Sequence, residues 1–444
     1  MLNRRQLLSG LAAVPLAGGV AGSSRLFALP VATVRPRIPW TDFVRSDDYP
    51  ALVAAVRQMK RNRDPDDPEG WRFWARAHEK HCPHGSDYFL AWHRGFLHLF
   101  EQHIRQLTRR DHLRIPYWNY FQLSKVPHEL AAGGSRNPFF ERRKGLDVGA
   151  ALLYRAFDPT LDKFQHGLGD CFESRLESCH NNIHNLIGGA MTTMQSPSDM
   201  VFWIHHANVD RLWAGWAARR PLAIPAADSP YWDGELEYGA GFKIGRRQVI
   251  DPALLGYSYE NVELPAKPRP EPGKPSILLP PGAEIAEQRG AASKPPRRTA
   301  SGDIALDEQS TTFVITKEKA PEYDPSRGHQ DHRAAVGPVV ILDAVALTES
   351  GREGGYFYKV YLDLPGFAGD PEERLLATFG PFQIAAALHH AEDGRVQISL
   401  PASDLLARLG EQRSDDLKIS FVRVSATGAP EGDVITVGSV KLQS

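Results

Sequence analysis

The sequence predicts a mainly α-helical core followed by a separate β domain. Apolar residues recur with the helical period in three segments of the first half: 49–60, 92–107 and 199–216. A Pro-rich tract at 266–298 has the composition of an extended linker. Strand-like runs bounded by Gly, Asp and Glu follow it, at 338–347, 356–364, 417–424 and 434–442. Helices first and strands afterwards indicate two domains.

The composition is that of an ordinary globular protein. The 444 residues are 42% hydrophobic and 24% charged, which excludes a disordered chain, a coiled coil and a collagen-like fibre. Lys+Arg number 52 against 53 Asp+Glu, and this neutral balance argues against nucleic acid as a partner. Three cysteines are too few for a disulfide scaffold.

The first thirty residues are typical of an export signal. Arg4 and Arg5 precede a weakly apolar stretch that runs to about Gly22 and is shorter than the roughly 18–20 residues that span a bilayer. Twin arginines in this context predict a Tat-type signal, although a basic N-terminus without a targeting role is the alternative. We therefore expect a periplasmic or secreted protein with no membrane segment. The expected parts are a signal at 1–30, a helical domain at 31–265, a linker at 266–310 and a β domain at 311–444.

Histidines cluster at three places in the helical part. His78, His81, His84 and His93 lie within sixteen positions, a density that chance alone could give in a His-rich chain. His180 and His184, however, are one helical turn apart and so share a face. A further histidine precedes Asp210 by one turn. Neutral imidazole binds zinc, copper and iron, so these clusters predict a histidine-only metal site without choosing the metal.

These clusters resemble the copper motifs of the tyrosinase, catechol oxidase and haemocyanin family. The pattern H84-x4-F89-L90-x-W92-H93-R94-x2-L97-x3-E101 is similar to the first-copper motif. D199-x2-F202-W203-x2-H206-x3-D210 is similar to the second, with Met200 in place of the usual Pro. HNNIHNLIGG and IPYWNYF resemble two further segments of the family. The resemblance covers about 35–265 and implies a four-helix bundle that holds two copper ions.

Carried over residue by residue, the resemblance implies one ligand set on each copper. His81 is a less favoured alternative in the first set, and His205 is the rival of His206 in the second. Asp210 is expected to orient a histidine or to pair with an arginine. The implied sets are His78, His84 and His93 for the first copper, and His180, His184 and His206 for the second.

The cysteines carry two further expectations. Cys82 stands two residues before His84, a spacing that in fungal relatives and molluscan haemocyanins carries a thioether to the histidine ring. A free buried thiol is the alternative. If Cys82 is used in this way, Cys171 and Cys179 are left to pair as a disulfide, which an exported chain permits.

The resemblance implies oxidation of o-diphenols to o-quinones with O2, with ortho-hydroxylation of monophenols. Asn181 and Glu177 are the implied catalytic residues, because they match an asparagine and a glutamate that hold a water near the second copper. An ordinary exposed helix acid is the alternative for Glu177. The segment 191–197 is expected to form the gate over this copper.

The last part of the chain resembles the tail domain of plant polyphenol oxidases. YFYKVYLDL and VGSVKL carry this likeness, and DPALLGYSY is similar to the segment that follows the catalytic core. It implies a β-sandwich-like or jelly-roll-like cap that keeps the enzyme latent, with a purely stabilising domain as the alternative.

Three other functions remain open on the sequence. A reversible O2 carrier of haemocyanin type and an o-aminophenol oxidase need the same six histidines, while a structural zinc domain is disfavoured because such sites are usually Cys-rich. A small phenol and a metallochaperone are the candidate partners, and the oligomeric state is left open.

Overall fold

The computed structural model describes residues 35–167, 170–268, 297–318, 337–363, 367, 369–389, 391, 393–410 and 416–443. The predicted export signal at 1–30 lies outside these residues, and so does the linker between 269 and 296. Among the described residues, no helix is both long enough and apolar enough to cross a bilayer.

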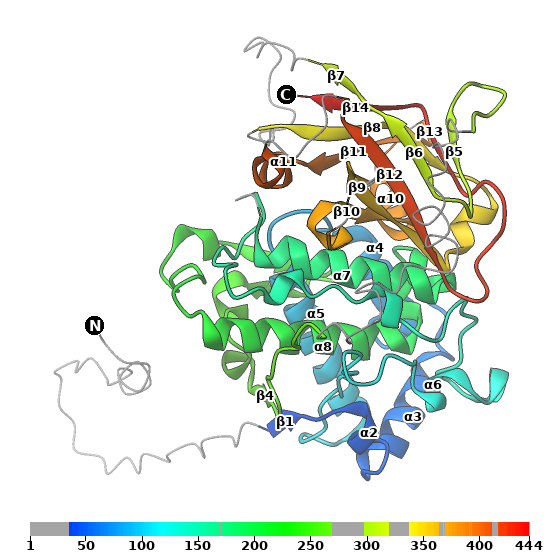
Figure 1. Cartoon of the computed structure of the whole chain (residues 1–444). Helices are drawn as coiled ribbons and strands as arrows, with labels where there is room; N and C mark the ends of the chain where they lie inside the picture. The colour runs from blue at the N-terminus through cyan, green and yellow to red at the C-terminus, as the bar shows by residue number, and fades with distance from the viewer. Residues whose placement is uncertain are drawn as a thin grey trace, which may run out of the picture. The chain divides into compact units, whose positions relative to one another are not determined.

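Four long helices form the centre of the core (Figure 1): α4, Trp71–His81; α5, Phe89–Thr108; α7, Phe172–Ile187; and α8, Met200–Arg219. Helix α3, Asp48–Met59, packs on α5, and the short helices α2, Trp40–Phe43, and α6, His128–Ala131, lie outside this group. The three helices predicted from periodicity are confirmed. Aromatic rings pack between these helices. Phe100 of α5, for example, stacks on Trp203 of α8 with ring centroids 3.5 Å apart.

Helix α8 begins at Met200, the position where the second-copper motif usually has a proline. Asp199 is the N-cap residue, and its side chain accepts the backbone N–H of Val201 at 2.8 Å. Arg143 holds the same carboxylate with two contacts of 2.7 Å. An N-cap of this kind contributes about 1 kcal/mol, so the helix start needs no proline.

Short strands close the core at its edges. Strand β1, Arg35–Arg37, pairs in parallel with β4, Tyr257–Tyr259, and so joins the two ends of the helical part. Strands β2, Glu235–Glu237, and β3, Lys243–Gly245, form an antiparallel pair.

The C-terminal part consists of two sheets with one shared apolar core. The four-stranded sheet has the order β10 (Leu375–Phe379), β9 (Tyr356–Leu362), β12 (Lys418–Ser425), β6 (Thr311–Val314). The six-stranded sheet has the order β5 (Ile304–Leu306), β13 (Ile435–Val437), β8 (Val339–Leu347), β14 (Ser439–Gln443), β7 (Thr316–Glu318), with β11 (Val396–Pro401) also paired to β8. Strand β5 lies before residue 311, inside the segment expected to be linker. The predicted fold class, a helical core followed by a β-sandwich-like domain, is confirmed.

The segment 434–442, predicted as one strand, is assigned as two. Strands β13 and β14 keep the same register against β8, since Ile435 faces Leu347 and Ser439 faces Asp343. The interruption at Gly438 lies opposite Ala344, which adopts the left-handed conformation with φ 51°. The two pieces are therefore one strand with a local irregularity.

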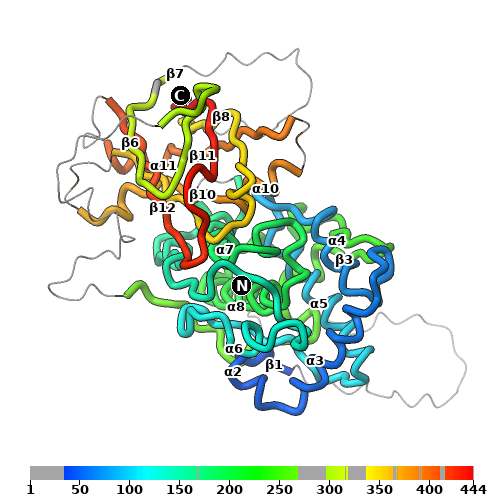
Figure 2. The backbone as a smooth tube through the Cα atoms, turned by 90° about the vertical axis from the view of Figure 1, so that its right-hand side faces the viewer, coloured from blue at the N-terminus to red at the C-terminus, as the bar shows by residue number. Residues whose placement is uncertain are grey.

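The helical and strand-rich parts share an apolar cluster. Phe357, Tyr361, Leu375, Val422 and Val424, all from β9, β10 and β12, belong to the same buried cluster as the bundle helices. Helix α7 contacts β9, β10 and α10, Pro381–Leu388, and Figures 1 and 2 both draw α7 between β10 and α8. A second short helix, α11, Ser403–Leu409, packs within the β domain. Separating the parts would expose this apolar surface to water.

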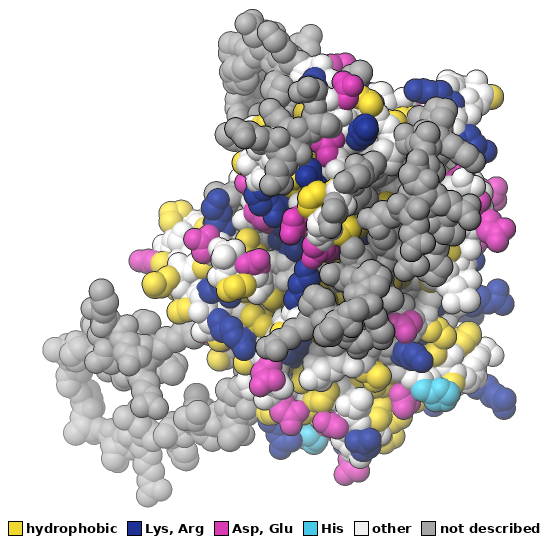
Figure 3. Space-filling view, in the orientation of Figure 1, with side chains coloured by type: hydrophobic (Ala, Val, Ile, Leu, Met, Phe, Trp, Pro, Cys, Tyr) yellow, Lys and Arg dark blue, Asp and Glu magenta, His cyan; other side chains and the backbone are white. Residues whose placement is uncertain are grey.

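The described surface carries charges of both signs. On the face shown in Figure 3, the Lys and Arg side chains that the structure describes are interspersed with Asp and Glu. This agrees with the formal net charge of −1.

Candidate metal centre

Two groups of buried and partly buried side chains meet between the bundle helices. The first contains His78 at the end of α4, Cys82 and His84 in the following loop, and His93 of α5. Within this group, the possible ligand atoms all lie within 4.8 Å of one another.

The second group comes from α7 and α8, and its possible ligand atoms also lie within 4.8 Å of one another. Its members are His180, His184, His205 and His206. The groups are neighbours, because the rings of His93 and His206 stack with centroids 4.0 Å apart.

Backbone and amide oxygens fix the orientation of four imidazoles. The ring Nδ1 of His78 contacts the carbonyl oxygen of Met194 at 2.7 Å, and that of His184 contacts the carbonyl oxygen of Met191 at 2.7 Å. His93 is held in the same way by the carbonyl of Phe89 at 2.8 Å. Because a carbonyl only accepts, Nδ1 carries the hydrogen and Nε2 keeps its lone pair. His180 makes the fourth such contact, with Oδ1 of Asn181 at 3.0 Å.

The free nitrogens fit a metal. The Nε2 atoms of His78 and His184 are buried without a hydrogen-bond partner among the described residues. The Nε2 atoms of His180 and His206 are 3.0 Å apart, as expected for two ligands of one ion. Leaving such nitrogens buried and unpaired is unfavourable, so the donor set fits cations that prefer imidazole.

Burial keeps these imidazoles neutral. It lowers the pKa of His78 to about 4 and that of His205 to about 3. Burial also holds the pKa values of the other five histidines of the two groups well below the ordinary value, with the neighbouring imidazoles as a further cause. Neutral rings are the form that binds a metal.

The two alternative histidines have different surroundings. His81 ends α4 and lies outside both groups. His205 lies inside the second group, with its ring stacked on that of His180 at 5.1 Å and both of its nitrogens unpaired among the described residues. The choice of His206 over His205 as ligand therefore stays a prediction.

Cys82 lies at the edge of the first group. Its Sγ is 3.4 Å from Nε2 of His93 and 3.7 Å from Nε2 of His84. Burial raises the pKa of the thiol well above its ordinary value, and the nearby Glu177 adds to the effect. The thioether to His84 stays a prediction.

The expected pairing of Cys171 with Cys179 is wrong. Both are free thiols, and Cys171 donates to the hydroxyl of Ser174 at 3.2 Å. Cys171 caps the start of α7, while Cys179 lies inside the helix. Eight residues of helix separate two Cα atoms by about 12 Å, beyond the roughly 7 Å that a disulfide can bridge.

The segment 191–197, expected to form a gate, helps to orient histidines in both groups. Met191, Thr192 and Ser196 are fully or almost fully buried. The carbonyls of Met191 and Met194 fix His184 and His78, one histidine of each group. Side-chain patterns could not reveal this role, because backbone carbonyls have no residue signature.

Glu177 lies on the histidine-bearing face of α7. Glu177, His180, Asn181 and His184 have the spacing that forms one helical stripe. Glu177 is only 3% exposed, so its interpretation as an exposed helix acid is wrong. Its Oε1 accepts the backbone N–H of Gly85 at 2.8 Å, which ties α7 to the loop of His84.

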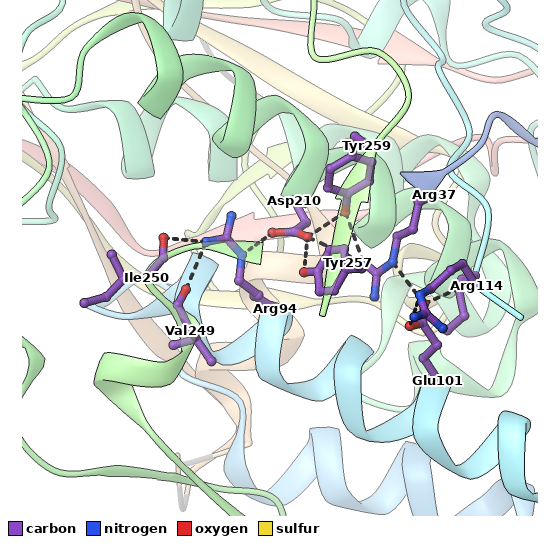
Figure 4. A network of polar contacts seen from close by, with 10 residues as sticks. Arg37, Arg94, Glu101, Arg114, Asp210, Val249, Ile250, Tyr257 and Tyr259 are labelled. Atoms are coloured by element: carbon purple, nitrogen blue, oxygen red, sulfur yellow. Dashed lines mark hydrogen bonds and ion pairs between the residues drawn. The ribbon is translucent and has the colours of Figure 1, made fainter. Parts of the chain in front are cut away.

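A buried network joins α5 and α8 (Figure 4). Asp210 accepts from Nε of Arg94 at 2.6 Å and from the hydroxyls of Tyr257 and Tyr259, each at 2.6 Å. Burial would raise the pKa of this carboxyl, but Arg94 and Arg37 outweigh it and hold the pKa below its ordinary value. Of the two roles expected for Asp210, pairing with an arginine is confirmed.

The same network extends to the end of the first-copper motif. Oε2 of Glu101 accepts from Nε of Arg37 at 3.1 Å and from the backbone N–H of Ile115 at 2.9 Å. Arg37 belongs to β1, so the network also fixes the first strand of the core.

One residue of the β domain covers the second histidine group. Phe382 of α10 stacks on His184 with ring centroids 4.2 Å apart, and its centroid is 5.1 Å from that of His84. Its backbone N–H donates to Oδ1 of Asn185 at 2.7 Å, while Nδ2 of Asn185 donates to Gln383 at 2.9 Å. No sequence pattern predicts this contact, because it joins segments far apart in the chain.

Two adjacent groups of neutral histidines on a helical bundle define a protein with a paired metal centre. The family described as the common central domain of tyrosinase matches residues 52–149 and 147–219. The tyrosinase of Streptomyces lincolnensis is 32% identical over 191 residues, which are 33% of this chain and 69% of that protein. The chain belongs to the tyrosinase family.

Other relatives extend this comparison. Tyrosinase HcTyr1 of Hahella sp. is 29% identical over 231 residues, and the match spans 42% of this chain and about half (48%) of that protein. A G-type haemocyanin of Enteroctopus dofleini is 28% identical over 227 residues, 41% of this chain and 8% of that protein. The solved structure of latent apple tyrosinase, 18% identical, has a TM-score of 0.54 and covers 93% of this chain and 97% of its own. That structure shares the fold of both parts.

Proposed function

We propose that this chain is a copper-dependent oxidase that converts o-diphenols to o-quinones with O2 and also ortho-hydroxylates monophenols. The observation that carries the proposal is the pair of adjacent histidine groups, in which Nε2 of His78 and Nε2 of His184 are buried without a hydrogen-bond partner among the described residues. Copper, when bound there, would supply O2 binding and electron exchange. The proposed ligands are His78, His84 and His93 for one ion, and His180, His184 and His206 for the other.

The reaction balances without a further reductant. Two catechols each lose two electrons and two protons, and one O2 accepts them to give two waters. For a monophenol, one oxygen atom enters the ring and the other leaves as water, with the o-quinone as product. The protein must therefore position the phenol and accept its hydroxyl proton.

We assign the proton step to Glu177 and Asn181. Both lie on the α7 stripe that carries His180 and His184. A carboxylate has about four lone-pair sites, so Glu177 can accept from a water in addition to Gly85. A water held there would take the phenolic proton and pass it to the carboxylate.

We further propose that Phe382 keeps the full chain latent. Its ring occupies space beside His84 and His184 that a phenol would need. The apple relative of the same fold is described as latent, which supports this reading.

A reversible O2 carrier is the second candidate. It would use the same histidines, and Phe382 suits it because a ring over His184 admits O2 while it excludes a phenol. An o-aminophenol oxidase would need the ring of Phe382 to leave the pocket, as the diphenol oxidase would.

The test uses the full chain loaded with copper, with the zinc-loaded chain as control. Catechol, a monophenol and an o-aminophenol are offered with a hydrazone reagent that traps quinones, before and after Phe382→Ala. Trapped o-quinone from both phenols in the copper form supports the proposal. Reversible O2 binding without product in either chain supports the carrier, and product from the o-aminophenol alone supports the third function.

We also propose export by the Tat route. Lys substitution of both Arg4 and Arg5 should then retain the protein in the cytoplasm, as fractionation of cells would show. Unchanged export would contradict the proposal.

A further inference from the structure

Two glutamates of α7 hold the segment that carries the first histidine group. Glu177 accepts the backbone N–H of Gly85 at 2.8 Å, next to His84. Glu173, one turn earlier, accepts the backbone N–H of Leu90 at 3.0 Å, at the start of the helix that carries His93. Two buried carboxylates of α7 therefore fix the segment between His84 and the start of α5.

His166 bridges these two carboxylates from a separate loop. Its ring Nε2 contacts Oε2 of Glu177 at 2.8 Å, and its backbone N–H donates to Oε2 of Glu173 at 3.3 Å. The side chains of His166 and Glu177 are 15% and 5% exposed. A hydrogen bond between ionised groups that are shielded from water is strong and directional.

The charges around His166 favour its protonated ring. Burial works to lower its pKa, but the hydrogen bond to Glu177 and the charges of Glu177, Glu173 and Asp87 outweigh burial, so the pKa is raised. Burial raises the pKa of Glu173 to about 7, with the charge of His166 opposing it. These charges therefore favour the imidazolium form of His166 beside Glu177.

We propose that His166 is a positioning residue for deprotonation of the phenol, which it serves by donating from Nε2 to Glu177 and holding this carboxylate in place on the α7 stripe. This inference rests on the proposed function of Glu177. The phenolic O–H bond breaks, the proton passes through a water to Glu177, and the electron pair stays on the phenolate. His166 does not touch the phenol, because Glu177 lies between them.

Removal of His166 should change the acid–base behaviour of Glu177. In His166→Leu, the carboxylate would stay buried with Gly85 as its remaining donor. Burial without a cationic partner favours the protonated acid, which cannot accept the phenolic proton. In His166→Gln, a neutral N–H donor can replace the ring, so part of the effect should be rescued.

The experiment measures kcat/KM from pH 5 to 9 for a monophenol and a catechol in the copper-loaded full chain carrying Phe382→Ala. In His166→Leu, the acid limb for the monophenol should move to higher pH by about one unit, which is about a tenfold loss of rate on that limb. His166→Gln should lie between this variant and the parent. His103→Leu is the matched control, because His103 is a largely buried histidine that packs on Trp74.

A second readout does not depend on activity. NMR titration of the His166 ring in the diamagnetic copper(I) form should show a raised pKa that falls in Glu177→Gln. An equal loss for both substrates with an unmoved acid limb, or an unchanged His166 pKa in Glu177→Gln, would overturn the role of His166 while the proposed function stands. Failure of the parent chain to oxidise either phenol would overturn both.

Discussion

Replacement of Phe382 by alanine should activate the full chain. The ring is 1% exposed and stacks on His184, and burial of a phenylalanine contributes about 1.5–3 kcal/mol. Since about 1.4 kcal/mol corresponds to a factor of ten, these contacts can favour the closed pocket by roughly 10- to 150-fold. We therefore expect kcat/KM for a catechol to rise within that range.

The assay is initial O2 uptake with a small and a bulky catechol, in the intact chain and in Phe382→Ala. The gain should be larger for the bulky catechol, because the block is steric. Phe313→Ala is the matched control, since Phe313 stacks on Phe421 within the β domain and touches neither histidine group. Equal rates in Phe382→Ala and the intact chain on both substrates would refute the reasoning, as would equal activation by Phe313→Ala.

Four further expectations follow from the site. His206→Ala should reduce copper from two ions per chain to one by metal analysis, whereas His205→Ala should keep two; the reverse result would exchange their roles. Intact-mass analysis of the denatured copper protein should show two hydrogens missing and Cys82 resistant to alkylation, and an alkylated Cys82 would exclude the thioether. Asp210→Asn leaves buried arginines without their counter-charge and should lower the free energy of unfolding by about 3 kcal/mol in urea. The copper-free chain should lose stability as pH falls from 6.5 to 4, because the folded state disfavours a proton on His78, whose pKa is about 4. At pH 5 the loss of unfolding free energy due to His78 is about 2 kcal/mol, and this loss should vanish in His78→Gln.

The junction of the two parts bears on proteolysis of the Pro-rich tract. An extended linker such as the one predicted at 266–298 is readily cut by proteases, and the structure describes only residues 266–268 and 297–298 of it. Strands β9, β10 and β12, however, share a buried cluster with the helices. A cut chain should therefore stay associated and latent until denaturant separates its parts, which size exclusion with an activity assay would show.

Spacing within a helix was enough to predict part of the second histidine group, whereas the first group, from α4, a loop and α5, was implied by the family resemblance. His180 and His184 share a face at one-turn spacing, and the position of His206 relative to Asp210 follows the same rule. The strands were also predictable, because 356–364 and 417–424 are short runs rich in aromatic and β-branched residues and are bounded by Gly, Asp and Glu.

Features that depend on tertiary contacts were not predictable. Met191 and Met194 act through backbone carbonyls, which every residue possesses. Phe382 and His166 reach the site from segments distant in sequence, and an isolated Phe or His has many ordinary roles. The partner of Asp210 stayed open until the fold placed Arg94 beside it.

The most direct test of the central claim is O2 uptake with catechol by the copper-free Phe382→Ala chain, titrated with copper from zero to two ions per chain. The paired centre predicts that uptake reaches its maximum only at two ions per chain. Full uptake at one copper per chain, or equal uptake with zinc, would contradict a dinuclear copper oxidase.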